Sequence, residues 1–218
     1  MITPTAWWRR PLFFPLPDPT KPEALPDLAQ QKQAFRDTAR QRRAEAARAA
    51  GADAAGRLAA HLTAIIEALP AGVVSAYLQI ADEIDPGAAL DHAAGLGWTR
   101  ALPVVMARAE PLRFRAWQPG DALEDGPLRT RHPAAGAAEV RPDLLLVPML
   151  AFDASGQRMG WGGGFYDRTL AALRAEKQIL AIGIGFAGQQ VDKVPSGPHD
   201  APLDAVATDA GVTRFKEF

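Results

Sequence analysis

Two continuous apolar runs, Asp143 to Pro148 and Ile179 to Gly185, most constrain how this chain can fold. Runs of this length without polar alternation are typical of strands buried on both faces of a sheet. Between them lie a glycine-rich stretch and then a helical pattern from about Tyr166 to Lys177. A strand, a helix and a second strand in this order predict an α/β fold around a largely parallel sheet.

The rest of the chain continues this alternation. Asp27, with Gln30 three residues later, predicts a helix from Leu28 to about Gly51, and Asp53 a second helix ending at Pro70. A further short helix is expected at 88–94, and an irregular stretch over 118–142. Four further strands are expected, at 73–78, 100–105, 112–117 and 205–208. We therefore predict a three-layer sandwich around a mostly parallel sheet, as a single domain over residues 27–218 behind a proline-rich extension, 1–26.

Charge and composition exclude several functional classes. The 24 Lys and Arg nearly balance 25 Asp and Glu, so a general nucleic-acid binder or a membrane-surface protein is not favoured. Prolines interrupt the apolar N-terminal segment, which therefore lacks the features of a signal peptide. The chain has no cysteine, which excludes disulfides, thiolate zinc sites and cysteine nucleophiles.

The strongest local signal is the glycine loop, which we define as residues 158–164. Four of the five positions from Gly160 to Gly164 are glycine, and the loop stands between a buried strand and a helix start. Such a backbone can turn several N–H groups toward one anion, and Arg158 and Arg168 could add contacts to phosphate oxygens. A flexible connector is the alternative, although embedded aromatic residues and arginines argue against it.

Two nucleotide-binding motifs do not fit. A Walker loop needs Lys followed by Ser or Thr after its last glycine, whereas Phe165 and Tyr166 stand there. Residues 183–188 match GxGxxG, but Pro195 and Pro198 argue against the helix that a dinucleotide fingerprint must open.

A basic stripe, defined as Lys32, Arg36, Arg40 and Arg43, lies on one face of the first predicted helix because its spacing is i, i+4, i+8 and i+11. A solvated helix face is the simpler interpretation, and an RNA-binding surface a third. A triphosphate held between this stripe and the glycine loop is the sharper hypothesis.

Two carboxylates near the glycine loop are candidates for a metal. Asp167 follows the loop directly, and Asp200 lies in a turn after another strand. Hard oxygen ligands of this kind hold Mg²⁺ beside phosphates. A helix cap for Asp167 and a turn residue for Asp200 are the structural alternatives. The four histidines share no spacing that would indicate zinc.

The stretch VPMLAFDASGQRMGWGGGFYDRTL, from Val147 to Leu170, resembles the signature of the 5-formyltetrahydrofolate cyclo-ligase family, also called 5,10-methenyltetrahydrofolate synthetase. KQAFR at Lys32 to Arg36 and YLQIADEID at Tyr77 to Asp85 are similar to further segments of that family. The resemblance covers the chain from about Leu28 to its end, in the same order.

The resemblance implies a cytoplasmic, ATP-dependent ligase that converts 5-formyltetrahydrofolate to 5,10-methenyltetrahydrofolate, with Mg²⁺ as cofactor and ADP and phosphate released. A non-catalytic nucleotide-binding or anion-binding regulator of the same fold is the alternative. The resemblance allows a folate substrate with a polyglutamate tail and leaves the oligomeric state open.

The resemblance also implies site residues. Those expected to contact ATP are Lys32, Arg36, Arg158, Met159, Gly160, Trp161, Gly162, Gly163, Gly164, Phe165 and Tyr166. Those expected at the folate site are Leu78, Glu83, Trp161, Gly162, Gly163, Gly164 and Phe165. Asp167 and Asp200 would hold Mg²⁺. The chain departs from the family pattern at Pro86 and around His132, which concerns the folate side more than the ATP side.

Overall fold

The computed structural model describes residues 27–218, so the predicted proline-rich extension, 1–26, lies outside the described residues. The helices are α1 (Leu28–Ala50), α2 (Ala54–Ala68), α3 (Gly87–Gly95) and α4 (Phe165–Glu176), with the 3-10 turns η1 (Pro127–Arg129) and η2 (Ala187–Gln189). The strands of the main sheet are β1 (Val73–Ser75), β2 (Thr99–Val104), β3 (Arg113–Ala116), β6 (Glu139–Val140), β7 (Leu144–Pro148), β10 (Leu180–Ile184), β11 (Ala205–Thr208) and β12 (Gly211–Arg214). Two small ribbons pair β4 (Leu123–Asp125) with β5 (Arg131–Pro133), and β8 (Ala151–Phe152) with β9 (Arg158–Met159).

The main sheet has the strand order β12-β11-β10-β7-β1-β2-β3-β6. Strands β11, β10, β7, β1 and β2 pair in parallel, whereas β12, β3 and β6 join antiparallel at the two edges. Chain order runs outward in both directions from the β1–β7 pair, which makes this pair the topological switch point of the sheet. Ligands of open α/β sheets bind beyond the carboxyl ends of the strands at such a point.

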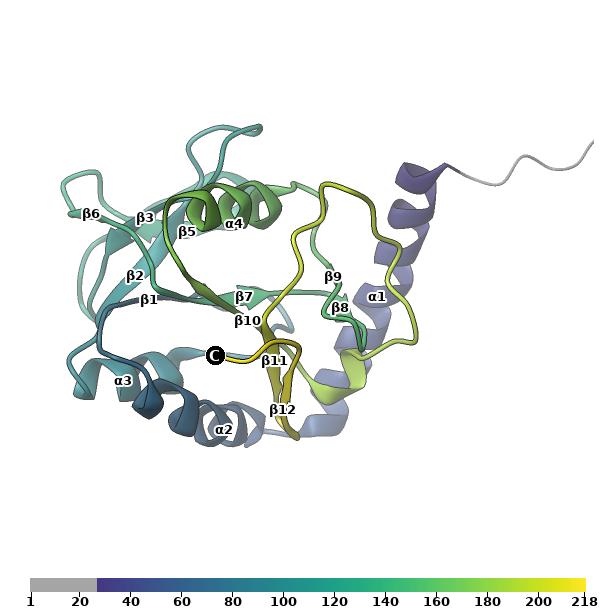
Figure 1. The fold of residues 1–218 in the computed structure, drawn as a ribbon, viewed down its shortest axis with the longest axis horizontal. Helices are drawn as coiled ribbons and strands as arrows, with labels where there is room; N and C mark the ends of the chain where they lie inside the picture. Colours follow the sequence, from purple (N-terminus) through teal and green to yellow (C-terminus); the bar gives the residue numbers. More distant parts are fainter. Residues whose placement is uncertain (1–26) are drawn as a thin grey trace, which may run out of the picture.

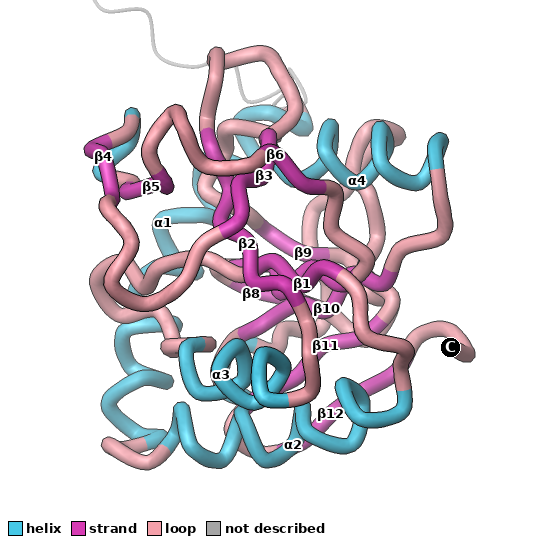
Figure 2. Tube along the Cα trace, turned by 90° about the vertical axis from the view of Figure 1, so that its left-hand side faces the viewer, coloured by secondary structure: helices cyan, strands magenta, loops and turns pink. Residues whose placement is uncertain are grey.

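Alternate residues of the central strands pack on opposite faces, which creates the three layers predicted from the sequence (Figure 1). Leu144 and Leu146 of β7 belong to the core that α2 and α3 cover, and Leu145 belongs to the core that α4 covers. Figure 2 shows α2 and α3 on one side of the sheet and α4 on the other. The prediction of an α/β sandwich around a mostly parallel sheet is confirmed.

Helix α1 lies beside the β8–β9 hairpin rather than in either main layer (Figure 1). Its residues Phe35 and Ala39 pack against Leu150, Met159 and Val194 in a third apolar cluster. The predicted cap at Asp27 is confirmed, because its side chain accepts a hydrogen bond from the Gln30 N–H at 2.8 Å. The helix ends at Gly51, whose φ of 75° is the left-handed conformation that glycine tolerates.

Several details differ from the sequence-based prediction. Asp53 precedes α2, but its side chain makes no capping hydrogen bond. The stretch 118–142 holds three short strands, and β8, β9 and β12 were not predicted. The GxGxxG segment leads into the single 3-10 turn η2 and opens no α-helix, as its prolines indicated. Among the described helices, none combines the length and apolar character that crossing a bilayer would require.

Candidate functional site

The loops at the switch point carry the residues that the sequence singled out. Strand β1 leads into the segment with Tyr77, Leu78 and Glu83, and β7 leads into the β8–β9 hairpin and the glycine loop. Because β1 and β7 are parallel neighbours, both segments leave the sheet at the same edge. The fold therefore places the predicted folate-side and ATP-side segments next to each other.

A buried aspartate fixes the hairpin that presents the glycine loop. Asp153 accepts hydrogen bonds from the backbone N–H groups of Ser155, Gln157 and Val194, and from the Ser155 hydroxyl at 2.6 Å. Burial alone would raise the pKa of Asp153, but these donors outweigh burial and hold it below its usual value. Asp153 thus ties the hairpin to the segment around Val194.

The glycine loop takes conformations that only glycine adopts readily. Gly162 has a φ of 102°, and Gly164, the N-cap residue of α4, has a φ of 65°. A Cβ on Gly163 would lie 2.5 Å from the Phe165 ring. Arg168 braces the loop by donating to the carbonyls of Gly163 at 2.8 Å and Arg108 at 3.0 Å. The loop is therefore a turn with a defined conformation that Arg168 braces, which argues against a flexible connector.

The basic stripe of α1 meets the glycine loop. Arg36 donates to the Gly160 carbonyl at 3.3 Å, and a Cβ on Gly162 would lie 3.1 Å from its guanidinium carbon. The Trp161 ring lies 5.7 Å from the guanidinium of Arg40 and 4.7 Å from that of Arg43. All four stripe residues are at least partly buried, so the solvated-face interpretation is wrong.

The two metal candidates are brought together at the N-terminus of α4. Asp167 accepts from Arg158 at 2.8 Å and from the backbone N–H of Ala201 at 3.1 Å. Asp200, the residue before Ala201, pairs with Lys32 at 2.5 Å and accepts from the Gly197 N–H at 2.6 Å. The capping alternative for Asp167 is wrong, because Gly164 occupies the N-cap position. Asp200 does close a turn, as the turn-residue interpretation predicts, and its carboxylate also pairs with Lys32.

The oxygen donors present suit Mg²⁺ bound together with phosphates. Within residues 27–218 no three His, Asp or Glu side chains gather as a metal-binding group. A magnesium ion held by one or two carboxylates, phosphate oxygens and waters needs no such group. Asp167 and Asp200 supply two such carboxylates, and they are neighbours because Asp167 accepts from the N–H of Ala201, the residue after Asp200.

In the segment predicted to bind folate, Glu83 is buried at 5% exposure, and both of its carboxylate oxygens accept hydrogen bonds. Its Oε2 accepts from the Ile80 N–H at 3.0 Å, and its Oε1 accepts from the Trp161 indole N–H at 3.1 Å. Burial raises the pKa of Glu83 despite these donors and the nearby Arg43. The exposed-acid interpretation of Glu83 is therefore wrong.

Two tyrosines surround this carboxylate. The Tyr77 hydroxyl donates to the Ile84 carbonyl at 2.7 Å. Burial, together with the charge of Glu83, raises the pKa of Tyr77 and of Tyr166, so both phenols stay neutral. Leu78 follows Tyr77 and is half-buried in the same segment.

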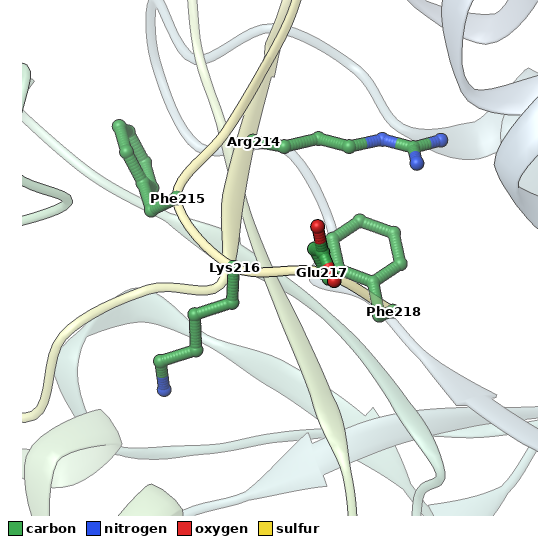
Figure 3. Close-up of a pocket in the computed structure, with 5 residues that line it drawn as sticks. All are labelled: Arg214, Phe215, Lys216, Glu217 and Phe218. Carbon is green, nitrogen blue, oxygen red and sulfur yellow. The ribbon is translucent and has the colours of Figure 1, made fainter.

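A cavity of about 330 Å³ adjoins Glu83. Its lining includes the acidic residues Asp82, Glu83 and Asp85 and the apolar residues Ala47 and Phe186. This combination suits a flat heterocycle with N–H donors. Figure 3 shows a second cavity of about 410 Å³, lined by Arg214, Phe215, Lys216, Glu217 and Phe218. Consecutive residues at the chain end form it and no predicted site residue lines it, so we assign it no function.

The remaining predicted ATP residues lie along one continuous path. Arg158 and Met159 form β9, residues 160–164 form the turn, and Phe165 and Tyr166 begin α4. The Met159 side chain is buried in the third apolar cluster, which leaves its backbone for any ligand contact. Arg158 is also buried and donates to the Ala201 carbonyl as well as to Asp167.

Sequence reasoning missed the supporting residues. Asp82 pairs with Arg43 at 2.7 Å, and Asp153 organises the hairpin, yet neither was predicted for the site. The signal for Asp153 was present in the run Asp153-Ala154-Ser155-Gly156, which is typical of a turn closed by an aspartate side chain. Nothing local marked Asp82.

The fold and these contacts define an α/β protein with a glycine-rich turn at the switch point of its sheet. The sequence model of the 5-formyltetrahydrofolate cyclo-ligase family matches residues 28–209, and the chain belongs to that family of ligases. A 5-formyltetrahydrofolate cyclo-ligase of Mycolicibacterium smegmatis is 38% identical over 143 residues, which are 62% of this chain and 72% of the relative. The enzyme of the same name from Escherichia coli K12 is 33% identical over 150 residues, 66% of this chain and 82% of the relative.

Solved structures support the fold independently. The NMR structure of Aquifex aeolicus 5,10-methenyltetrahydrofolate synthetase matches with a TM-score of 0.64 at 23% identity, and the match covers 86% of this chain and 94% of that one. A 5,10-methenyltetrahydrofolate synthetase from Mycoplasma pneumoniae matches with a TM-score of 0.63 at 21% identity, over 82% and 98% of the two chains. At these identities the likeness concerns the fold.

Proposed function

We propose that this chain converts 5-formyltetrahydrofolate to 5,10-methenyltetrahydrofolate at the expense of ATP, with residues 27–218 as the catalytic domain and 1–26 as an appended extension. The observation that carries the proposal is the convergence of the basic stripe, the glycine loop and Glu83 at one sheet edge. We place the reaction in the cytoplasm, as the family resemblance implies.

The proposed chemistry needs positioning and charge neutralisation rather than a protein nucleophile. A formyl oxygen is a poor leaving group, so the γ-phosphoryl of ATP is transferred to it and ADP leaves. The N10 lone pair attacks the activated carbon, N10 loses its proton, and the C–O bond breaks as phosphate departs. Phosphoryl transfer of this kind depends on alignment and on compensating charge. A site without cysteine, a serine triad or paired histidines can supply both.

On the ATP side, the side chains of Lys32, Arg36 and Arg158 contact phosphate oxygens, and the glycine loop supplies backbone N–H groups. The contact between Arg36 and the loop supports this assignment, because both elements can then approach the same anion. The N-terminus of α4 adds its dipole at the same place.

Asp167 and Asp200 would hold Mg²⁺, which supplies positive charge to the phosphates when it is bound. Each carboxylate already contacts a cation of the ATP side, Arg158 or Lys32. The proposed phosphate-binding cations and metal ligands are thus side by side.

On the folate side, Glu83 accepts hydrogen bonds from the pterin N–H groups, and the cavity of about 330 Å³ beside it receives the ring. Leu78 and the residues from Trp161 to Phe165 line the path toward ATP. A polyglutamate tail on the substrate is compatible with the arginines of β3 and the neighbouring loops.

The test mixes the full chain, 5-formyltetrahydrofolate and MgATP, and follows the methenyl chromophore together with ADP release. We expect equimolar methenyl product and ADP. Binding of ATP without folate-dependent ADP release would overturn the proposal and support a nucleotide-binding regulator.

A further inference from the structure

Arg43 is the most buried cation of the described chain, with 2% of its surface exposed, although it lies on a helix at the edge of the molecule. A buried charge is costly unless partners compensate it. For Arg43 the compensating partners are two carboxylates of the segment that follows β1.

A single guanidinium connects two segments of the site. Arg43 Nη2 donates to Asp82 at 2.7 Å, and Nη1 lies 3.4 Å from Glu83 Oε1. The same guanidinium lies 4.7 Å from the Trp161 ring centroid. Trp161 in turn donates its indole N–H to Glu83 Oε1 at 3.1 Å. Arg43, Trp161 and Glu83 thus form a closed triangle in which each member contacts the other two.

This triangle depends on guanidinium chemistry. A planar guanidinium can donate to two carboxylates while its face contacts an indole, whereas an ammonium is a compact point charge. The cluster is not arranged for maximal stability, because the buried Arg43 Nε has no hydrogen-bond partner. Buried ion clusters are weak evidence for stability. The cluster is therefore better explained as a device that fixes the positions of its side chains.

We infer that Arg43 is a positioning residue, an inference that rests on the proposed function. Arg43 orients the Glu83 carboxylate for folate and holds Trp161 of the glycine loop against Glu83. Arg43 acts through Glu83 and touches neither substrate. Its loss consequently weakens folate binding while the phosphoryl-transfer machinery is retained.

The test uses Arg43→Lys in the full-length protein, with Arg42→Lys as the matched control. Arg42 is exposed on the same helix and donates to the Gly188 carbonyl outside the site. We expect Arg43→Lys to raise the KM for 5-formyltetrahydrofolate about tenfold, the size of one charge-assisted hydrogen bond. In Arg43→Lys, kcat and the KM for MgATP should stay within about threefold of the unmodified protein. In Arg42→Lys, kcat and both KM values should stay near those of the unmodified protein.

A double substitution separates positioning from direct contact. If Arg43 acts through Glu83, Arg43→Lys adds less than about a twofold change in folate KM to a protein that already carries Glu83→Gln. An undiminished tenfold effect in that background would mean that Arg43 acts independently of Glu83, and would overturn the inference.

Trp161→Phe provides a second variant should Arg43→Lys fold poorly. It keeps an aromatic face but removes the donor to Glu83, so folate KM should rise in the same direction. Unchanged folate KM in Trp161→Phe, or an Arg43→Lys protein that behaves like Arg42→Lys, would overturn the positioning role. Turnover by the unmodified protein tests the proposed function separately, since a protein without turnover refutes that function whatever the variants do.

Discussion

At the scale of single residues, Glu83 shows a conflict between stability and function. Its raised pKa means that folding favours the protonated acid, so its contribution to stability is present below the unfolded value near 4.5 and is lost as pH rises through the folded pKa. At neutral pH the charged Glu83 is therefore a cost to the fold, which fits its proposed role in binding folate.

We expect Glu83→Gln to be as stable as the unmodified protein, or more stable, at pH 7, because glutamine carries no charge to desolvate. The stability difference should shrink toward pH 4, where Glu83 is protonated in both states. Folate KM should rise at least about tenfold. Urea unfolding at the two pH values and steady-state kinetics measure these effects. A large loss of stability at pH 7 would show instead that Glu83 supports the fold.

Asp167 should show the signature of a metal ligand. Asp167→Asn still accepts from the Ala201 N–H but loses its charge toward Arg158 and Mg²⁺. We expect kcat/KM to fall at least about a hundredfold at fixed Mg²⁺, while stability falls by only about 1 kcal/mol.

Titrating activity with Mg²⁺ and comparing melting temperatures provides the check for Asp167. Parallel losses of activity and stability would mark Asp167 as a structural residue at the start of α4.

At the scale of elements, the glycine loop should tolerate no side chain at Gly162. Gly162→Ala forces a Cβ onto a residue with φ of 102° and places it 3.1 Å from Arg36. We expect the KM for MgATP to rise at least about tenfold, and the strain to cost about 1–2 kcal/mol.

Gly136→Ala is the control for that variant. A Cβ at Gly136 meets nothing within 4 Å, and this glycine lacks a positive φ. Isothermal titration with a non-hydrolysable ATP analogue would measure the difference. Equal ATP affinity in the two variants would contradict a phosphate-binding loop.

Helices were the elements that the sequence predicted best. Asp27 and Gly51 mark the ends of α1, and the helix expected from Tyr166 to Lys177 is observed one residue earlier, from Phe165 to Glu176. Strands β8 and β9 escaped prediction because two residues each are too short for a periodic pattern. Their pairing is imposed by Asp153 and by contacts with α1, which local propensity does not encode.

At the scale of the whole molecule, the sequence predicted which residues could act but not that they meet. Lys32 and Asp200 are 168 positions apart, and Arg36 and Gly160 are 124 apart. The resemblance to a known family supplied the members of the site, whereas their contacts follow from how α1 packs on the hairpin. The sequence pattern is consistent with a solvent-exposed Arg43, whereas the structure buries it.

Stability toward acid also depends on contacts across the whole molecule, because Asp204 joins three parts of it. It accepts from the Ala181 N–H of β10, from Arg174 of α4 and from Lys216 near the chain end. Burial would raise the pKa of Asp204, but these donors and cations hold it below 3.8. A lowered pKa contributes stability that is present above the unfolded value and is lost as pH falls through the folded pKa.

We expect the free energy of unfolding to decline as pH falls below about 4, with a slope of up to about 1.4 kcal/mol per pH unit from Asp204. Asp204→Asn should lower stability at pH 7 by about 2 kcal/mol and flatten this decline. Urea unfolding between pH 3 and pH 7 measures both. An unchanged slope in Asp204→Asn would assign the acid sensitivity to other carboxylates.

The 168 positions between Lys32 and Asp200 also have a consequence during synthesis. At about 5–20 residues per second, a ribosome makes the basic stripe roughly 8–34 s before it makes the aspartate that pairs with Lys32. During that interval the emerging chain exposes Lys32 without its carboxylate partner, whereas Arg40 already has Asp37 on the same helix and Arg43 gains Asp82 and Glu83 only 39 and 40 positions later. Slow translation near the end of the message would prolong this exposure, so the yield of native enzyme should depend on codon usage there.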